Sequence, residues 1–284
     1  MSEMIYVMGA GRSGTTLVDI ILGNAKHITS LGELNRYSVC NGKVSEQSLQ
    51  DTKDFWALFY EDFESKEVDW EELTRAVRKH EYHTSIYSVF LYGIGHSFQK
   101  YKAYILKFFD CLYPKIETQF FVDSSKYPLR LWHLLRLDIP VKACVYVKRN
   151  PTDVVRSFRK KGIEQPPKGA FMSCLYLMVV HALCGLTMNL LKKRKIICAV
   201  LDYNQLVQNP VETLKKLENQ LGIDIGDVIK KVKTGDSFKT GCLFDGNRIR
   251  FKERISLDIK QKKVSSTYST SERLIYALNS FWWP

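Results

Sequence analysis

Short apolar runs alternate with stretches of helical periodicity along most of the chain. The apolar runs predict buried strands at Ile5–Met8, His27–Leu31, Gln119–Val122, Val141–Val147 and Ile196–Leu201. The stretches between them predict helices over Thr15–Leu22, Leu129–Leu137, a segment opened by Pro151, 170–192, and Pro210–Leu221 before Gly222. Because strands alternate with helices, we expect an α/β fold with a parallel sheet and helices on both faces.

Three segments depart from this alternation. Residues 45–110 are rich in aromatic residues at helical spacing and predict a helical insertion, with aromatic side chains for the core and some for a pocket. Residues 234–268 are polar and contain glycines, and a loop of that length in a compact domain is usually functional or disordered. Residues 271–284 predict an amphipathic helix. With no repeat and no linker, residues 1–284 are expected to form a single domain.

The composition is that of a soluble globular protein with a strong positive charge. Of the 284 residues, 45% are hydrophobic and 25% charged, and the net charge is +12. Such an excess favours anionic partners: nucleic acid, a membrane surface, or a phosphorylated or sulfated small molecule. The basic run at 192–195 suits the end of a solvated helix. The run at 148–161 is different, because it carries a candidate binding motif.

Neither the cysteines nor the apolar runs indicate an exported or membrane-spanning protein. The seven cysteines form no C-x-x-C pair and no zinc-type spacing, and four of them lie in apolar runs. This pattern favours a reducing, cytoplasmic location. The N-terminus lacks the basic region of a signal peptide. The most apolar segment, at 173–191, is expected to be a buried helix because it contains His181 and Asn189.

A glycine-rich loop, GAGRSGTT at residues 9–16, follows the first predicted strand. Strand, glycine loop and helix together make a site for phosphate, because the loop amides and the helix N-terminus point at the anion. The lysine of the ATPase phosphate loop is missing, and Thr15 stands in its place. Arg12 supplies a cation within the loop instead.

Two alternatives follow from this loop alone. Gly9, Gly11 and Gly14 spell G-x-G-x-x-G, and Glu33 lies about 20 residues further on, as in a dinucleotide site. A kinase would need an acid near a strand end to help hold Mg²⁺, and Asp123 could supply it. Lys126, three residues later, would compete with that metal. A site built from cations suits a donor that needs no metal.

A second anion site is expected after the strand at 141–147. Arg149 ends that strand, Ser157 lies two helical turns further on, and Lys161 follows one turn later on the same face. A guanidinium, a hydroxyl and an ammonium group that converge there can hold a second phosphate. The ligand is therefore expected to carry anionic groups at two separate places.

With both anchors in view, the chain resembles the sulfotransferases that use 3′-phosphoadenosine 5′-phosphosulfate (PAPS). GAGRSGTT resembles their 5′-phosphosulfate loop, and RNPTDVVRS resembles their 3′-phosphate motif. SLGELN and VDSSKYP resemble the catalytic glutamate and lysine segments of the tyrosylprotein-type and bacterial branches. Two further segments, VLDYNQLVQNPVETLKKLENQLGI and FDGNRIRF, resemble a strand–helix unit and the C-terminal loop of bacterial members.

Together these segments cover most of the chain from residue 5 to residue 252, except the helical insertion. The chain departs from the family at two positions. Arg12 replaces the lysine of the cytosolic branch, and Asn204 stands where glutamate is usual. The resemblance implies a P-loop-like fold and an enzyme that transfers a sulfuryl group from PAPS, leaves adenosine 3′,5′-bisphosphate (PAP), and requires no metal.

The resemblance also implies roles for individual residues. The donor would be bound by Gly11, Arg12, Ser13, Gly14, Thr15, Thr16, Arg149, Ser157, Lys161, Tyr203, Gly246, Asn247 and Arg250. Of these, Arg149, Ser157 and Lys161 would hold the 3′-phosphate, Tyr203 would contact the adenine, and the last three would close over the nucleotide. Arg12 and Lys126 would stabilise charge during transfer.

Glu33 is the expected base for the acceptor proton, with His27 as its rival and His133 expected in the core. The acceptor stays open: a small molecule, carbohydrate, peptide, polyketide or lipid with a hydroxyl or amine, and not nucleic acid. The oligomeric state also stays open. The remaining alternatives are a P-loop nucleotide-dependent kinase and a nucleotide-binding protein without turnover.

Overall fold

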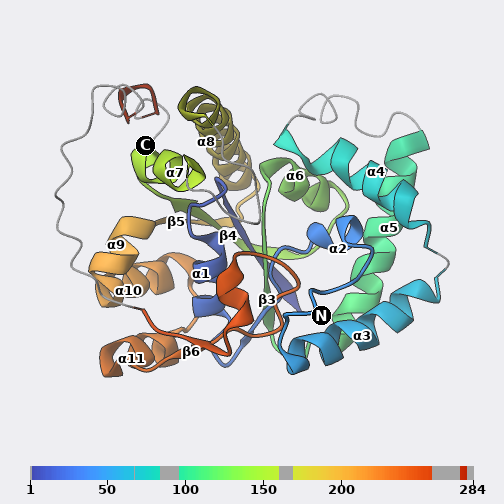
Figure 1. Ribbon diagram of the computed structural model, residues 1–284, viewed down its shortest axis with the longest axis horizontal. Helices are drawn as coiled ribbons and strands as arrows, with labels where there is room; N and C mark the ends of the chain where they lie inside the picture. The colour runs from blue at the N-terminus through green and yellow to red at the C-terminus, as the bar shows by residue number, and fades with distance from the viewer. Residues whose placement is uncertain (1, 67, 84–95, 160–168, 258–275, 280–284) are drawn as a thin grey trace.

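The computed structural model describes residues 2–66, 68–83, 96–159, 169–257 and 276–279. Its centre is a parallel sheet of five strands in the order β2-β3-β1-β4-β5 (Figure 1). These strands are β1 (Glu3–Gly9), β2 (Ile28–Ser30), β3 (Phe120–Lys126), β4 (Val141–Lys148) and β5 (Ile197–Asp202). The predicted α/β class is confirmed, and each predicted strand has its counterpart in this sheet.

Helices cover both faces of the sheet because successive strand residues point in opposite directions. Met4, Tyr6 and Met8 of β1 belong to one apolar cluster, and Ile5 and Val7 belong to the other. The first cluster includes residues of α3 (Gln50–Glu64), α4 (Trp70–Glu81), α5 (His96–Leu112), α6 (Pro128–Arg136), α7 (Pro151–Arg159) and α8 (Ala170–Lys193). The second includes residues of α1 (Thr15–Leu22), α9 (Tyr203–Gln208), α10 (Pro210–Leu221) and α11 (Gly226–Thr234).

The predicted helical insertion forms α3, α4 and α5, which lie together at one side of the molecule in Figure 1. Its aromatic side chains pack around Tyr37, which follows the start of the short helix α2 (Arg36–Val39). The Tyr37 ring centroid lies 5.0 Å from that of Phe59 and 4.9 Å from that of Phe244. These contacts join the insertion to the C-terminal loop. Residues 84–95 of the insertion lie outside the described part of the chain.

Helix α8 was expected as a buried helix at 170–192. By length and composition it could cross a membrane, with a mean hydropathy of 1.8 over 18 residues. Half of that stretch is buried within the fold, where α8 contacts α6, α7, β1 and β5. Cys174, Cys184 and Leu177 are among its buried side chains.

Several elements differ from expectation. Strand β3 continues to Lys126 instead of ending at Val122, because Asp123, Ser124 and Ser125 are fully buried and pair within the fold. The segment 234–257 contains the hairpin β6 (Phe238–Lys239) and β7 (Arg254–Ile255) and the 3₁₀ helix η3 (Arg248–Phe251), where we expected an irregular loop. Short helices α2, α9 and α11 were not predicted. Of the helix expected at 271–284, only residues 276–279 are described, and they are helical.

Candidate active site

A pocket of about 1100 Å³ lies where the parallel strands end. Gly11 follows β1, Glu33 follows β2, Lys126 ends β3, Arg149 follows β4 and Tyr203 follows β5, and all five line this pocket. The carboxyl ends of parallel strands are where open α/β sheets bind ligands. The strand order places β1, which leads into the glycine loop, between β3 and β4.

The glycine loop requires glycine at residue 14. Gly14 has φ +102°, a left-handed conformation, and a Cβ atom there would lie 2.2 Å from the ring of Tyr203. Helix α1 begins at the next residue, so its first amides face the loop. Thr15 and Thr16 line the pocket, and Arg12 sits in the loop with φ +66°. This geometry provides amides, hydroxyls and a cation for one anion.

Ser13 is placed differently from its neighbours. Its side chain is buried and does not line the pocket. Its amide donates to the Ala10 carbonyl at 3.1 Å, and its Oγ has no hydrogen-bond partner among the described residues. Among residues 11–16, Ser13 is thus the one that does not line the pocket.

The second anchor approaches the same pocket from β4 and α7. Arg149 donates from Nη1 to the Arg12 carbonyl at 2.8 Å, and its Cζ lies 4.5 Å from the ring centroid of Tyr203. The buried Nε of Arg149 has no hydrogen-bond partner within the described part of the chain. Ser157 lines the pocket from α7. Lys161, the third predicted member, lies outside the described residues.

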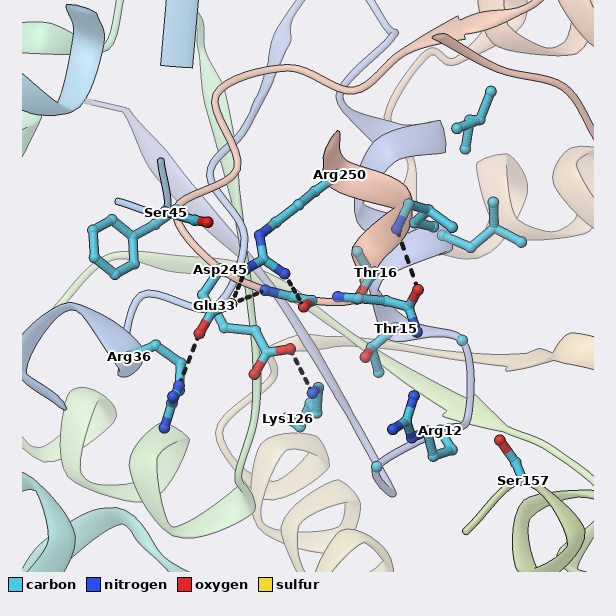
Figure 2. A pocket seen from close by; sticks show the side chains of 18 of the residues that line it. Arg12, Thr15, Thr16, Glu33, Arg36, Ser45, Lys126, Ser157, Asp245 and Arg250 are labelled. Atoms are coloured by element: carbon cyan, nitrogen blue, oxygen red, sulfur yellow. Dashed lines mark hydrogen bonds and ion pairs between the residues drawn. The ribbon is translucent and has the colours of Figure 1, made fainter. Parts of the chain in front are cut away.

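Glu33 and Lys126 meet between the two ends of the pocket (Figure 2). Lys126 Nζ lies 2.5 Å from Glu33 Oε1, and the Glu33 side chain is 9% exposed. Lys126 has φ +73°, which is costly for a residue other than glycine. Strand β3 therefore ends in a strained residue whose ammonium group points into the pocket.

Asp19 of α1 holds the loop that carries Glu33. Its carboxylate accepts hydrogen bonds from Ser30 Oγ at 2.6 Å, the Gly32 amide at 3.0 Å and Ser124 Oγ at 2.6 Å. Burial raises the pKa of Asp19 to about 7, although these three hydrogen bonds oppose the shift. The helix that begins at the glycine loop is thus tied directly to the residue before Glu33.

The C-terminal loop closes the pocket from another side. Asn247 donates its amide to Thr16 Oγ1 at 3.1 Å. Asp245 accepts from Arg36 Nε at 2.9 Å and pairs with Arg250 Nη2 at 2.9 Å (Figure 2). Gly246, Asn247 and Arg250, predicted to cover a nucleotide, all line the pocket beside the glycine loop.

Asp123, the acid considered for a kinase, does not face the pocket. It is completely buried and pairs with Arg130 Nε at 3.0 Å. It also accepts hydrogen bonds from the Ser125 amide and hydroxyl. Arg130 in turn pairs with Glu81 of α4 at 2.5 Å. Asp123 therefore anchors the insertion to the sheet. The described residues hold no group of three or more His, Cys, Asp or Glu side chains suited to a metal.

Of the two histidines singled out in the sequence, His133 is placed as expected and His27 is not. His27 is exposed just before β2 and does not line the pocket, so it is not positioned to act as the base. His133 is fully buried in α6, as expected, and burial lowers its pKa to about 3. His83 lines the pocket, with its ring centroid 4.7 Å from that of Tyr127 and 5.8 Å from that of Tyr176.

Sequence reasoning missed His83 and Tyr176. Tyr176 of α8 reaches the glycine loop, and its hydroxyl accepts a hydrogen bond from the Gly11 amide at 2.9 Å. Burial raises its pKa to about 12. The insertion was expected from the sequence to contribute aromatic side chains to a pocket, and this was the expectation that came closest to predicting His83. Nothing in the apolar pattern of α8 marks Tyr176.

Comparisons with known proteins agree with this geometry. A model of the sulfotransferase family matches residues 4–227. The sulfotransferase domain from the curacin biosynthetic pathway is 15% identical with a TM-score of 0.52, over 99% of this chain and 98% of that one. The sulfotransferase domain from the Synechococcus PCC 7002 olefin synthase has the same identity and TM-score, over 99% and 94%. At this identity the likeness shows a shared fold. No curated protein sequence matches the chain.

Proposed function

The chain belongs to the sulfotransferase family, and from that premise we propose that it transfers a sulfuryl group from PAPS to a hydroxyl or amine of an acceptor. The observation that carries this donor assignment is the pair of cationic anchors on one pocket. Arg12 lies in the glycine loop, and Arg149 bridges from the end of β4 to the Arg12 carbonyl. PAPS carries its phosphosulfate and its 3′-phosphate at two separate places, which matches two anchors.

The polar atoms around the pocket fit such an anionic donor. Arg149 and Arg250 line the pocket, and the Nε atom of each is buried and has no hydrogen-bond partner among the described residues. Buried polar groups usually have partners, so these two atoms are suited to a ligand that brings acceptor oxygens. Tyr203 presents its ring beside Arg149, where an adenine could stack.

We assign the 5′ end of the donor to the glycine loop and the 3′ end to Arg149 and Ser157. The loop amides, the N-terminus of α1 and the hydroxyls of Thr15 and Thr16 would bind the 5′-phosphate. Arg12 would hold the transferred group. Gly246, Asn247 and Arg250 would cover the nucleotide, because the Asn247 amide is already bonded to Thr16.

In the transfer itself, the bond from sulfur to the bridging phosphate oxygen breaks as a bond to the acceptor oxygen forms. Lys126 would stabilise the charge that develops on the leaving phosphate oxygen. Glu33 would take the proton that leaves the acceptor. In this structure each of the two neutralises the other, 2.5 Å apart. A donor oxygen beside Lys126 would compete with Glu33 for that ammonium group and leave the carboxylate available to the acceptor.

Donor choice is tested by thermal unfolding with added nucleotides. A ligand that binds the native state alone raises the melting temperature, and the rise grows with the ratio of its concentration to its dissociation constant. We expect PAP to raise it clearly, and ATP and NAD much less. Equal stabilisation by NAD would favour the dinucleotide alternative instead.

Turnover requires a separate assay with ³⁵S-labelled PAPS and a mixture of hydroxyl and amine acceptors. We expect label to move to an acceptor, and the rate to be unchanged by a chelator. A reaction that consumed ATP and required Mg²⁺ would indicate the kinase. Tight binding of PAP together with no transfer to any acceptor would indicate a nucleotide-binding protein without turnover.

A further inference from the structure

Basic side chains greatly outnumber acidic ones around the pocket. Eight lysines and arginines line it, against two carboxylates, Glu33 and Asp245. The eight are Arg12, Arg36, Lys43, Lys126, Arg149, Arg250, Lys252 and Arg254. Both carboxylates are already paired, since Glu33 binds Lys126 and Asp245 is shared by two guanidinium groups. The pocket therefore keeps a positive surplus that its own carboxylates do not neutralise.

The donor accounts for only part of this surplus. In the proposed function its anionic groups are matched by Arg12, Lys126, Arg149 and Arg250. Arg36 lies on the other side of the Glu33–Lys126 pair from Arg12 and Ser157, and Ser45 lies on that side too (Figure 2). In the proposed function Glu33 takes the acceptor proton, so the acceptor would approach from the side of this pair away from Arg12. Arg36 therefore supplies a positive charge to the part of the pocket where the acceptor would bind.

Arg36 is held so that part of its guanidinium stays available. It contacts Asp245 through Nε, and Asp245 is the one carboxylate with which it pairs among the described residues. Its side chain is 36% exposed, and the pairing with Asp245 raises its pKa despite burial. A planar guanidinium can bind an oxyanion through two parallel N–H groups.

Lys43 supplies a second cation on the same short segment. It is exposed, lines the pocket, and has no ion pair in the part of the chain that the structure describes. Gly42, just before it, has φ +69°, and a Cβ atom there would lie 2.5 Å from the ring of Tyr60. The Gly42 amide also donates to the Tyr37 carbonyl at 2.9 Å. The aromatic cluster of the insertion thus fixes the backbone that presents Lys43.

We propose that Arg36 and Lys43 bind an anionic group of the acceptor, so that the acceptor class is a hydroxyl compound that also carries a carboxylate or a phosphate or sulfate ester. This inference rests on the proposed function. Arg36 provides the directed contact, and Lys43 adds charge at the mouth of the pocket, where it attracts anions before they dock. A neutral alcohol would leave both cations unmatched.

The test uses protein saturated with PAP, so that the donor anchors are filled. The probes are ω-hydroxyalkanoates of increasing length, the matching ω-hydroxyalkyl phosphates, and the corresponding diols as neutral controls. Their affinities for this PAP-saturated protein are measured by ligand-observed NMR. Their sulfation is measured separately with ³⁵S-labelled PAPS and no added PAP. We expect at least one anionic length to bind and react clearly better than its diol. A preference for carboxylate or phosphate then identifies which anion the acceptor carries.

Three variants locate the effect. Arg36→Gln should lower the affinity for the preferred anionic probe about tenfold or more, because a charge-assisted contact is lost. Lys43→Gln should lower this affinity about two- to fivefold, because the lysine is exposed. Lys66→Gln is the matched control, an exposed lysine outside the pocket, and should change nothing. The diols should bind all variants equally.

The outcomes separate this inference from the proposed function. If the wild-type protein binds PAP and no anionic probe binds better than its diol, the acceptor inference is wrong and the donor assignment stands. If PAP itself does not bind, the proposed function fails first. If Arg36→Gln and Lys43→Gln keep the anionic preference, the anion site lies elsewhere and the assignment to these two residues is overturned.

Discussion

Lys126 at the end of β3 and Glu33 after β2 form an ion pair of 2.5 Å across the middle of the pocket. Each residue is held by separate means: Lys126 by a left-handed backbone conformation, and the Glu33 loop by the bond from the Gly32 amide to Asp19. Their closeness is therefore built into the ends of two neighbouring strands. The proposed chemistry assigns them different tasks, which single substitutions can separate.

Glu33→Gln should leave donor binding intact and slow transfer. General-base catalysis is typically worth about 10²–10⁴ in rate, and the loss should lie in that range. PAP should bind as well as or better than to the wild type, because a carboxylate repels an anionic donor. Calorimetry with PAP and a ³⁵S transfer assay give the two readouts. Glu61→Gln, at an exposed position of α3, is the control. A loss of PAP affinity with turnover retained would make Glu33 a ligand contact, as the dinucleotide alternative requires.

Lys126→Ala should lower kcat far more than it raises the donor KM. Charge develops beside the ammonium group only in the transition state, and removal of one such donor typically costs about 10²–10³ in rate. Steady-state kinetics with varied PAPS distinguish the two parameters. An unchanged kcat with a raised KM would place Lys126 in ground-state binding and contradict the catalytic assignment.

The sequence predicted the sheet and most of the candidate site because their signals are local. Within residues 5–22 a strand, a glycine loop and the start of a helix follow one another directly. The phosphate site that they form can therefore be predicted without knowledge of tertiary contacts. The basic run after the strand at 141–147 added Arg149, and the family resemblance added catalytic roles for Glu33 and Lys126; all three line the pocket. The parallel order of the strands then brings these segments together.

The rest depends on packing that no local pattern encodes. Strand β3 continues through Asp123 and Ser124 because Arg130 and Asp19 lie opposite them. A polar stretch without those partners would end the strand. His83 enters the pocket because the chain just after α4 lies against Tyr127 and Tyr176. Tyr176 enters it because α8 passes near the glycine loop. His27 fell outside the site because it precedes β2 instead of following it.

Arg149→Ala should chiefly weaken donor binding. Its guanidinium is remote from the reacting sulfur in the proposed function, and one charge-assisted contact is worth about 1.5–3 kcal/mol. We expect PAP affinity to fall at least tenfold and kcat at saturating PAPS to stay close to wild type. Arg159→Ala, at an exposed position near the end of α7, is the control. Calorimetry with PAP measures the effect, and an unchanged affinity would remove Arg149 from the donor site.

Asp19 should make stability depend on pH. Burial raises its pKa from 3.8 to about 7, so between these values the native protein binds more protons than the unfolded chain. The stability that this proton contributes is complete below pH 4 and is lost as pH rises through about 7. Asp19→Asn lacks this titration, so its stability relative to wild type should increase between about pH 4 and pH 7 and level off above that. Urea unfolding of both proteins across this range measures the difference. A difference that is constant with pH would contradict the raised pKa.

Arg130→Met should destabilise the fold more than any change at the pocket. Arg130 is 1% exposed and lies between Asp123 of β3 and Glu81 of α4, both fully buried. Removal of the guanidinium leaves two carboxylates without their cation, and the loss of one partner from a buried ion pair typically costs about 3–5 kcal/mol.

Glu81→Gln provides the comparison for that variant. It removes one of the two negative charges and leaves Asp123 paired with Arg130, so its cost should be smaller. Burial raises the pKa of Glu81 and so disfavours its charged form. Replacing it with a neutral side chain should therefore cost less stability. Urea unfolding of both variants gives the two free energies. If Arg130→Met proved as stable as Glu81→Gln, the triad would not be what holds the insertion to the sheet, and the aromatic cluster around Tyr37 would have to carry that connection.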